Sequence, residues 1–151
     1  MIKNPGEISL DEALSICQGA LEEGRNLNLM PLTVTVIDIA GVVRATLAEE
    51  GSGLIRSNIA YAKAWSCLAF NVSTNTLRTI FEDQPRLNMA INGMQIMSDG
   101  KLVPTPGGVL IQKDGKNIGA VGVTGDKSDM DEACAIAAIE KLGLIVGHKA
   151  T

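Results

Sequence analysis

The 151-residue chain carries a formal charge of −4, and this acidic balance argues against a nucleic-acid backbone as partner, since such binding needs clustered Lys and Arg. With 46% apolar and 20% charged residues, its length suits a single domain over residues 1–151. No apolar segment approaches the roughly 18 residues of a membrane span. Residues 1–12 are polar and acidic and lack the pattern of a signal peptide, so we expect a cytoplasmic protein.

Residues 9–47 predict a helix followed by a β-hairpin. Ser9 and Glu12 form a capping-box pattern, after which apolar residues recur at helical spacing to about residue 26. Beyond Pro31, residues 32–38 are β-branched and alternating, which is typical of a strand with one face against the core. A tight connection at 39–41 returns the chain as a second strand over 42–47.

The middle of the chain predicts helices. The segment 54–70 is apolar on more than one side, so it either lies centrally in the fold or contacts a second subunit. Ser73 or Thr74 caps a shorter helix that ends near Asp83, where Pro85 stops it. Residues 86–97 fit either a short helix or irregular chain.

The last third predicts a second hairpin and a final helix. Asp114-Gly115 supplies the positive φ angles of a primed turn between strands 109–113 and 116–123. Ser128 and Asp131 form a capping pattern that opens a helix running to about residue 142. Hairpins rather than βαβ units predict an α+β fold: a central, mostly antiparallel sheet built from two hairpins with helices packed on it.

Glycine is unusually dense between residues 105 and 125. Gly107 and Gly108 follow Pro106, and Gly119, Gly122 and Gly125 lie in and after a predicted strand. Because glycine weakens a strand, this density indicates close backbone approach to a neighbouring segment or a ligand. We interpret the region as the lining of a cavity, where the amides of 106–108 form a nest for a carboxylate or an oxyanion.

The cysteines and the histidine offer no metal site, because no cluster has zinc or iron spacing. Cys17, Cys67 and Cys134 are far apart in predicted helices, so we interpret them as small buried hydrophobes in a reducing compartment. His148, the single histidine, lies near the C-terminus, where we expect a solvated side chain.

Five segments resemble the GlcG/HbpS family, whose domain also forms the C-terminal part of PduO-type cobalamin adenosyltransferases. They are residues 36–41 (VIDIAG), 59–64 (IAYAKA), 106–111 (PGGVLI), 118–125 (IGAVGVTG) and 131–133 (DEA). They follow the family's order and cover nearly the whole chain. The resemblance implies an antiparallel sheet with helices on both faces, and assembly into dimers or larger even-numbered oligomers.

The resemblance leaves two functions open. Some relatives bind haem, others belong to catabolic operons, and a few are candidates for cofactor-free enzymes acting on small acids. We therefore expect a small-molecule-binding protein that holds haem or a related tetrapyrrole. The alternative is a cofactor-independent tautomerase, lyase or hydrolase acting on a small carboxylate. Apart from the resemblance, a structural role as an accessory subunit, with segment 54–70 as the interface, also stays open. Without a well-placed histidine, the candidate axial ligands of haem iron are Tyr61, Cys67, Met89, Met94 and Met97.

Under the enzymatic reading, three side chains are candidate acids and bases. Asp38 ends a strand at a turn, where it either forms an Asx-type turn or points into a pocket. Lys63 interrupts an apolar helix, so its ammonium needs water or a carboxylate, and a pair with Asp38 or Glu132 would join acid and base. Glu132 is the third candidate, because the neighbouring Asp131 alone meets the need for a negative charge at the start of the last helix.

Other residues are candidates for binding the ligand. Arg44 or Arg56 would hold a carboxylate by bidentate contact beside the glycine nest. The predicted ligand-binding set is Arg44, Arg56, Tyr61, Pro106, Gly107, Gly108 and Gly122.

Overall fold

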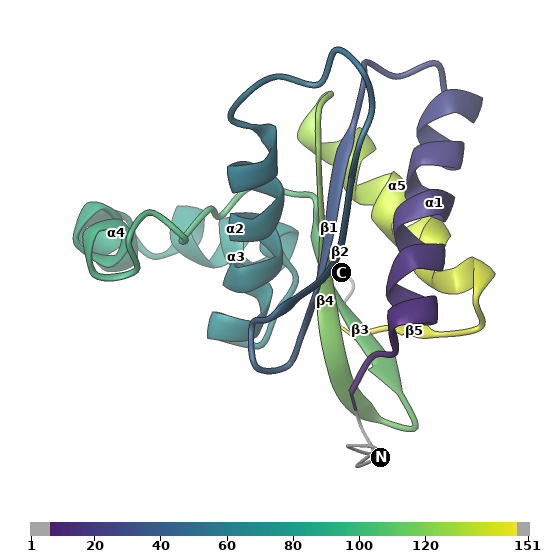
Figure 1. Cartoon of the computed structure of the whole chain (residues 1–151). Coiled ribbons are helices and arrows are strands. Elements are labelled where there is room, and N and C mark those ends of the chain that lie inside the picture. Colours follow the sequence, from purple (N-terminus) through teal and green to yellow (C-terminus); the bar gives the residue numbers. More distant parts are fainter. Residues whose placement is uncertain (1–6, 148–151) are drawn as a thin grey trace.

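The computed structural model describes residues 7–147, in which an antiparallel sheet carries helices on both faces (Figure 1). The sheet order is β2-β1-β4-β3-β5. The strands are β1 (Thr33–Asp38), β2 (Val43–Ala48), β3 (Gly108–Lys113), β4 (Lys116–Thr124) and β5 (Ile145–Val146). The helices are α1 (Leu10–Asn26), α2 (Arg56–Phe70), α3 (Thr74–Asp83), α4 (Pro85–Met97) and α5 (Ser128–Lys141). The predicted α+β class is confirmed.

Both predicted hairpins are present, and the pairing of β1 with β4 joins them into one sheet. Thr33 lies opposite Thr124, and Asp38 lies opposite Gly119. Asp114 and Gly115 have φ angles of 51° and 74°, as the primed turn requires. Strand β5 pairs with β3 at the sheet edge and was not predicted, because two residues are too short to show alternation.

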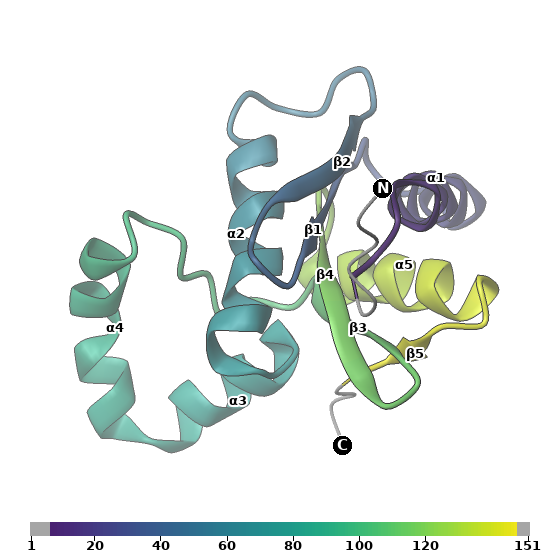
Figure 2. The same cartoon turned by 60° about the horizontal axis from the view of Figure 1, so that its bottom comes forward.

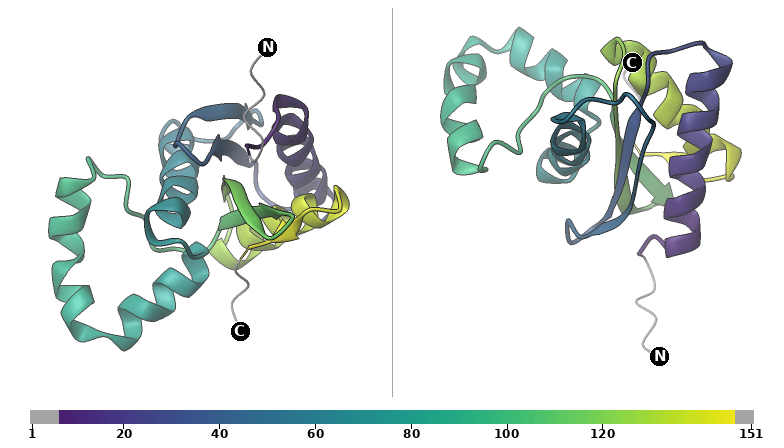
Figure 3. Two further views of the ribbon diagram at one scale, coloured as in Figure 1. Left: turned by 90° about the horizontal axis from the view of Figure 1, so that it is seen from below. Right: turned by 45° about the horizontal axis from the view of Figure 1, so that its top comes forward.

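The two faces of the sheet differ in what covers them. Val34 and Val36 of β1 point into the core beneath α1 and α5, and Ile37 points toward α2. Thr33 and Thr35 share the face of Ile37, because side chains alternate along a strand. Figure 3 shows the same layers from two further directions. The α2 face of the sheet is therefore partly polar.

The N-terminal boundary of α1 forms as predicted, whereas that of α5 does not. The Ser9 hydroxyl accepts a hydrogen bond from the Glu12 amide at 3.1 Å, and the Glu12 carboxylate accepts one from the Ser9 amide at 2.9 Å. Lys127 occupies the N-cap position of α5, and no side chain caps that helix. Ser128 is its first helical residue, and Asp131 is buried and engaged elsewhere.

Residues 86–97, ambiguous in the sequence, form α4. Pro85 ends α3 and stands in the first turn of the next helix, where its missing amide hydrogen costs nothing. Leu77 and Phe81 anchor α3 in a small core with Leu102. Helix α4 has no buried residue and lies apart from the sheet (Figure 2). Within residues 7–147, no helix is long and apolar enough to cross a bilayer.

Candidate functional site

Lys63 lies inside the protein, at the end of β4. Its ammonium donates hydrogen bonds to the Val123 carbonyl at 2.9 Å and to Asp131 Oδ2 at 3.2 Å. Lys63 is 2% exposed and Asp131 1%. The pair with Asp38 or Glu132 considered from the sequence is not formed. The ion pair connects α2 and α5, which cover opposite faces of the sheet (Figure 1).

Burial dominates the electrostatics of this ion pair. Desolvation lowers the pKa of Lys63, and the attraction of Asp131 offsets part of that effect. Desolvation likewise raises the pKa of Asp131, against the attraction of Lys63. Arg56 adds a second nearby positive charge, and its Nη1 donates to the Thr124 hydroxyl at 2.9 Å.

Asp38 shapes the turn between β1 and β2. Its Oδ1 accepts hydrogen bonds from the Ala40 amide at 2.8 Å and the Val42 amide at 3.1 Å, so the Asx-type turn is confirmed. Its Oδ2 accepts from the Arg44 guanidinium. Burial acts to raise the pKa of Asp38, but the Val42 amide and Arg44 hold it below its usual value. Arg44, a predicted ligand contact, is therefore engaged by Asp38.

The three candidate acids and bases do not converge. The Lys63 ammonium bonds Val123, opposite Val34, so it lies four strand residues from Asp38, a separation of about 13 Å at the usual rise per strand residue. Glu132 accepts a hydrogen bond from the Asn75 side chain at 3.0 Å, and burial raises its pKa. Each group thus has its own structural partner.

The dense glycines let α2 approach the sheet closely. A Cβ at Gly122 would lie 1.9 Å from the Ala60 carbonyl oxygen, and one at Gly108 would lie 2.4 Å from the Lys63 carbonyl oxygen. At Gly107 it would lie 2.7 Å from Lys63 Nζ, so this glycine makes room for the lysine. The prediction that these three glycines line a cavity is wrong, because α2 fills the space.

One amide of the predicted anion nest has a partner inside the protein. The Gly108 amide donates to the Thr74 hydroxyl at 2.8 Å, so it does not point to a ligand site. Pro106 is buried beside it. The hydroxyl of Ser73, at the N-cap position of α3, makes no hydrogen bond to any residue in 7–147.

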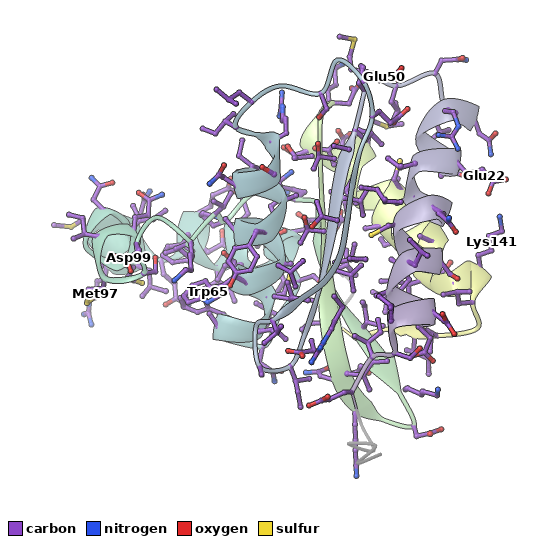
Figure 4. The ribbon with its side chains drawn as sticks, in the orientation of Figure 1. Glu22, Glu50, Trp65, Met97, Asp99 and Lys141 are labelled. Carbon is purple, nitrogen blue, oxygen red and sulfur yellow. The ribbon has the colours of Figure 1, made fainter. Side chains whose placement is uncertain are left out.

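An apolar groove lies on the outer side of α2, away from the sheet. Its main hollow, of about 290 Å³, lies between α2 and the end of α4. Its lining residues are Trp65, Ala69, Phe70, Met94, Met97, Ser98 and Leu102. An adjoining hollow of about 220 Å³ shares Trp65 and Ala69 and reaches the β1–β2 turn. We call these two hollows together the α2–α4 groove. Figure 4 labels two of its lining residues, Trp65 of α2 and Met97 of α4.

Sequence reasoning did not select Trp65, although a signal was present. Asn58, Tyr61, Trp65 and Ala69 recur at spacings of three and four residues, which places them on one face of a helix. The opposite face of α2 packs against the glycines of the sheet. The spacing therefore indicates which face stays available for a ligand.

The structure separates the candidate axial ligands of haem iron. Met94 and Met97 line the α2–α4 groove, whereas Met89 is 85% exposed and does not. The Cys67 thiol is buried and donates to the Lys63 carbonyl at 3.3 Å, and burial raises its pKa. Tyr61 donates its hydroxyl to the Gly41 carbonyl at 3.1 Å. His148 lies outside the described residues.

This arrangement defines an α+β protein with an apolar groove beside its central helix. Residues 8–140 match the family model described as haem degrading protein HbpS-like. The chain belongs to the HbpS-like family, as its resemblance predicted.

Comparisons with individual proteins agree with this family. The chain is 31% identical over 138 residues to the corrinoid adenosyltransferase PduO of Salmonella typhimurium, a match that covers 89% of this chain. It spans 40% of the length of that relative. The crystal structure of a PduOC:heme complex has a TM-score of 0.82 and 26% identity, with coverage of 95% of this chain and 99% of that one. The crystal structure of HbpS shares the fold, with a TM-score of 0.78, 22% identity and 94% coverage of each chain.

Proposed function

We propose that this protein binds haem in the α2–α4 groove. The observation that carries the proposal is the likeness to the PduOC:heme complex, which extends over almost the whole of both chains. Membership of the HbpS-like family supports it as well. Bound haem would supply a redox-active iron.

The groove fits a flat apolar ring. Trp65, Phe70 and Leu102 provide apolar and aromatic walls. Met94 and Met97 bring two thioethers, which are soft donors of the kind that ligate haem iron. The main hollow lies near the lower end of the range of roughly 300–1,000 Å³ for ligand pockets, so a porphyrin would extend past Trp65 into the adjoining hollow.

We further propose that the chain assembles into dimers or larger even-numbered oligomers through α4. Met89 is 85% exposed, and Ile96 and Met97 are each 79% exposed. Several large apolar side chains exposed together on one helix are a common mark of a protein interface. A second copy placed there would also narrow the mouth of the α2–α4 groove.

The enzymatic alternative has weaker support. Lys63, Asp38 and Glu132 are held apart, each by its own partner, so they offer no shared acid and base for a small carboxylate. The link to a catabolic operon stays a prediction of the resemblance, and the genomic neighbours would test it.

Titration with haemin tests the proposed function. We expect a sharp Soret band that saturates at one haem per chain. Met94→Ala or Met97→Ala should shift that band or weaken binding, whereas Met89→Ala on the same helix should leave it unchanged. A spectrum at equimolar haemin identical to that of free haemin would refute the proposal.

A further inference from the structure

A second, polar pocket of about 400 Å³ lies on the same side of the sheet, between β1–β2, α2 and the chain after α4. Its lining residues are Thr35, Val43, Thr46, Ser57, Asn58, Tyr61, Ala62, Asp99, Gly100 and Lys101. It contains none of the methionines and phenylalanines of the α2–α4 groove. The proposed haem function therefore makes no use of this polar pocket.

The floor of the polar pocket presents a hydrogen-bond donor. The hydroxyls of Thr35 and Thr46 lie 3.0 Å apart, and Thr35 is 1% exposed. Either hydroxyl can donate to the other, so the pair keeps one hydroxyl hydrogen that this contact does not use. Thr46 is the more exposed of the two, and its hydroxyl can serve a ligand in the pocket as donor or acceptor.

The wall formed by α2 adds further polar groups. The side chains of Ser57 and Asn58 lie in the first turn of α2 and make no hydrogen bond to any residue in 7–147. No side chain caps this helix end, whose dipole favours an anion. The Tyr61 hydroxyl donates its hydrogen to the Gly41 carbonyl, so its oxygen can accept a hydrogen bond from a ligand.

The third side of the polar pocket carries one charge of each sign. Lys101 contributes its ammonium, which lies 5.8 Å from the centre of the Trp65 ring, and Asp99 contributes a carboxylate. Neither charge forms a salt bridge with any residue in 7–147. Figure 4 shows Asp99 at the end of α4, on the side where Trp65 lies.

We propose that the polar pocket binds a small hydroxylated carboxylate. Lys101 and the first turn of α2 hold the carboxylate, by charge and by the helix dipole. Thr46, Ser57, Asn58 and Asp99 bond the hydroxyl groups of the ligand. A ligand that has a carboxylate but no hydroxyl group, or hydroxyl groups but no carboxylate, leaves part of this set of donors and acceptors unused.

Isothermal titration calorimetry with tartrate tests the proposal. Succinate lacks hydroxyl groups and erythritol lacks charge, so tartrate should bind at least about tenfold more tightly than either. Trp65 is the single tryptophan, so its fluorescence should respond to tartrate at the same concentrations. Equal affinities for all three probes, or no binding of tartrate, would overturn the proposal.

A charge-matched pair of variants locates the site. Lys101→Met keeps the aliphatic stem over Trp65 and should weaken tartrate binding about tenfold or more. Lys116→Met removes the same charge at the exposed β3–β4 turn and should bind like the wild type. If Lys101→Met folds poorly, Ser57→Ala is the second variant, and we expect it to weaken tartrate binding by a smaller factor.

The same variants separate the two proposed sites. Lys101→Met should keep the Soret band of the haem complex, because it changes no residue that lines the α2–α4 groove and keeps an aliphatic side chain over Trp65. Tartrate binding that is unaffected by both Lys101→Met and Ser57→Ala would contradict the assignment to this pocket, whatever the haem titration shows.

Discussion

At the residue level, Lys63 and Asp131 are the least expected pair in the structure. Removing two charges from water costs several kcal/mol per ion, and mutual attraction returns this only with good hydrogen bonds. Lys63 has two such bonds, and Asp131 also accepts one from the Asp126 amide at 3.0 Å. Each ion therefore depends on the other.

We predict that Lys63→Ala destabilises the protein by about 3–5 kcal/mol, because it leaves the Asp131 carboxylate buried without its counter-ion. The double variant Lys63→Met with Asp131→Asn removes both charges and should recover a large part of that loss. Urea unfolding followed by circular dichroism measures both. A single variant as stable as the wild type would show that the pair does not form.

Asp38 predicts a pH dependence of stability. Its pKa is lower in the folded protein than in the unfolded chain, so its contribution is present above about pH 3.8 and is lost as pH falls through the folded pKa. Asp38→Asn keeps an oxygen for the turn amides but loses the charge that pairs with Arg44. We expect it to cost about 1 kcal/mol at pH 7.

That cost should shrink toward zero as pH falls below about 3.8 and through the folded pKa, where the wild-type carboxylate is protonated too. Urea unfolding of both proteins across this range measures the difference. A difference between the two proteins that stays constant over the range would contradict the assigned pKa direction.

The sequence could predict that a single buried residue requires a polar or charged partner, but not which residue that partner is. The apolar setting of Lys63 indicated a carboxylate partner and Glu132 was considered, one residue from the true partner Asp131. Neighbouring residues of a helix point about 100° apart. Only the packing of α5 on the sheet decides whether Asp131 or Glu132 faces Lys63.

At the level of elements, the contact of α2 with the sheet explains the glycines. The density at 105–125 correctly predicted a close backbone approach. It could not tell whether a ligand or a helix makes that approach, because both require the absence of a side chain. Gly108 and Gly122 show that the approaching segment is α2.

We predict that Gly122→Ala destabilises the protein by about 3 kcal/mol, because its Cβ would overlap the Ala60 carbonyl and push α2 away. Gly93→Ala in α4 is the matched control. A Cβ there meets nothing within 4 Å, so higher helix propensity should add up to about 1 kcal/mol of stability.

Thermal and urea unfolding of both variants test this packing. Similar effects at Gly122 and Gly93 would contradict the close approach of α2 to β4.

At the level of the whole molecule, the sequence predicted the sheet and its covering helices but not the place of α4. Both hairpins could be recognised from strand alternation and from a turn that needs positive φ angles. Helix α4 packs only Leu87, Ile91 and Met94 against the small core of α3 and leaves Met89, Ile96 and Met97 exposed, so its apolar residues show no single buried face in the sequence.

We predict that the double variant Met89→Glu with Ile96→Glu shifts the protein to monomers, because buried carboxylates at an interface lack counter-ions. Asn88→Glu adds a charge of the same sign at an exposed polar position on another side of α4 and should keep the wild-type assembly. Sedimentation velocity measures the masses. A wild-type protein that is already monomeric would refute the proposed role of α4.

The most direct test of haem binding in the α2–α4 groove is a haemin titration of Ala69→Trp. Ala69 lines both hollows of the groove, so an indole there fills the proposed site. We expect at least about tenfold weaker haemin binding, while Ala90→Trp, at an exposed position of α4, should bind like the wild type. Wild-type haemin affinity in Ala69→Trp would place haem elsewhere and contradict this account.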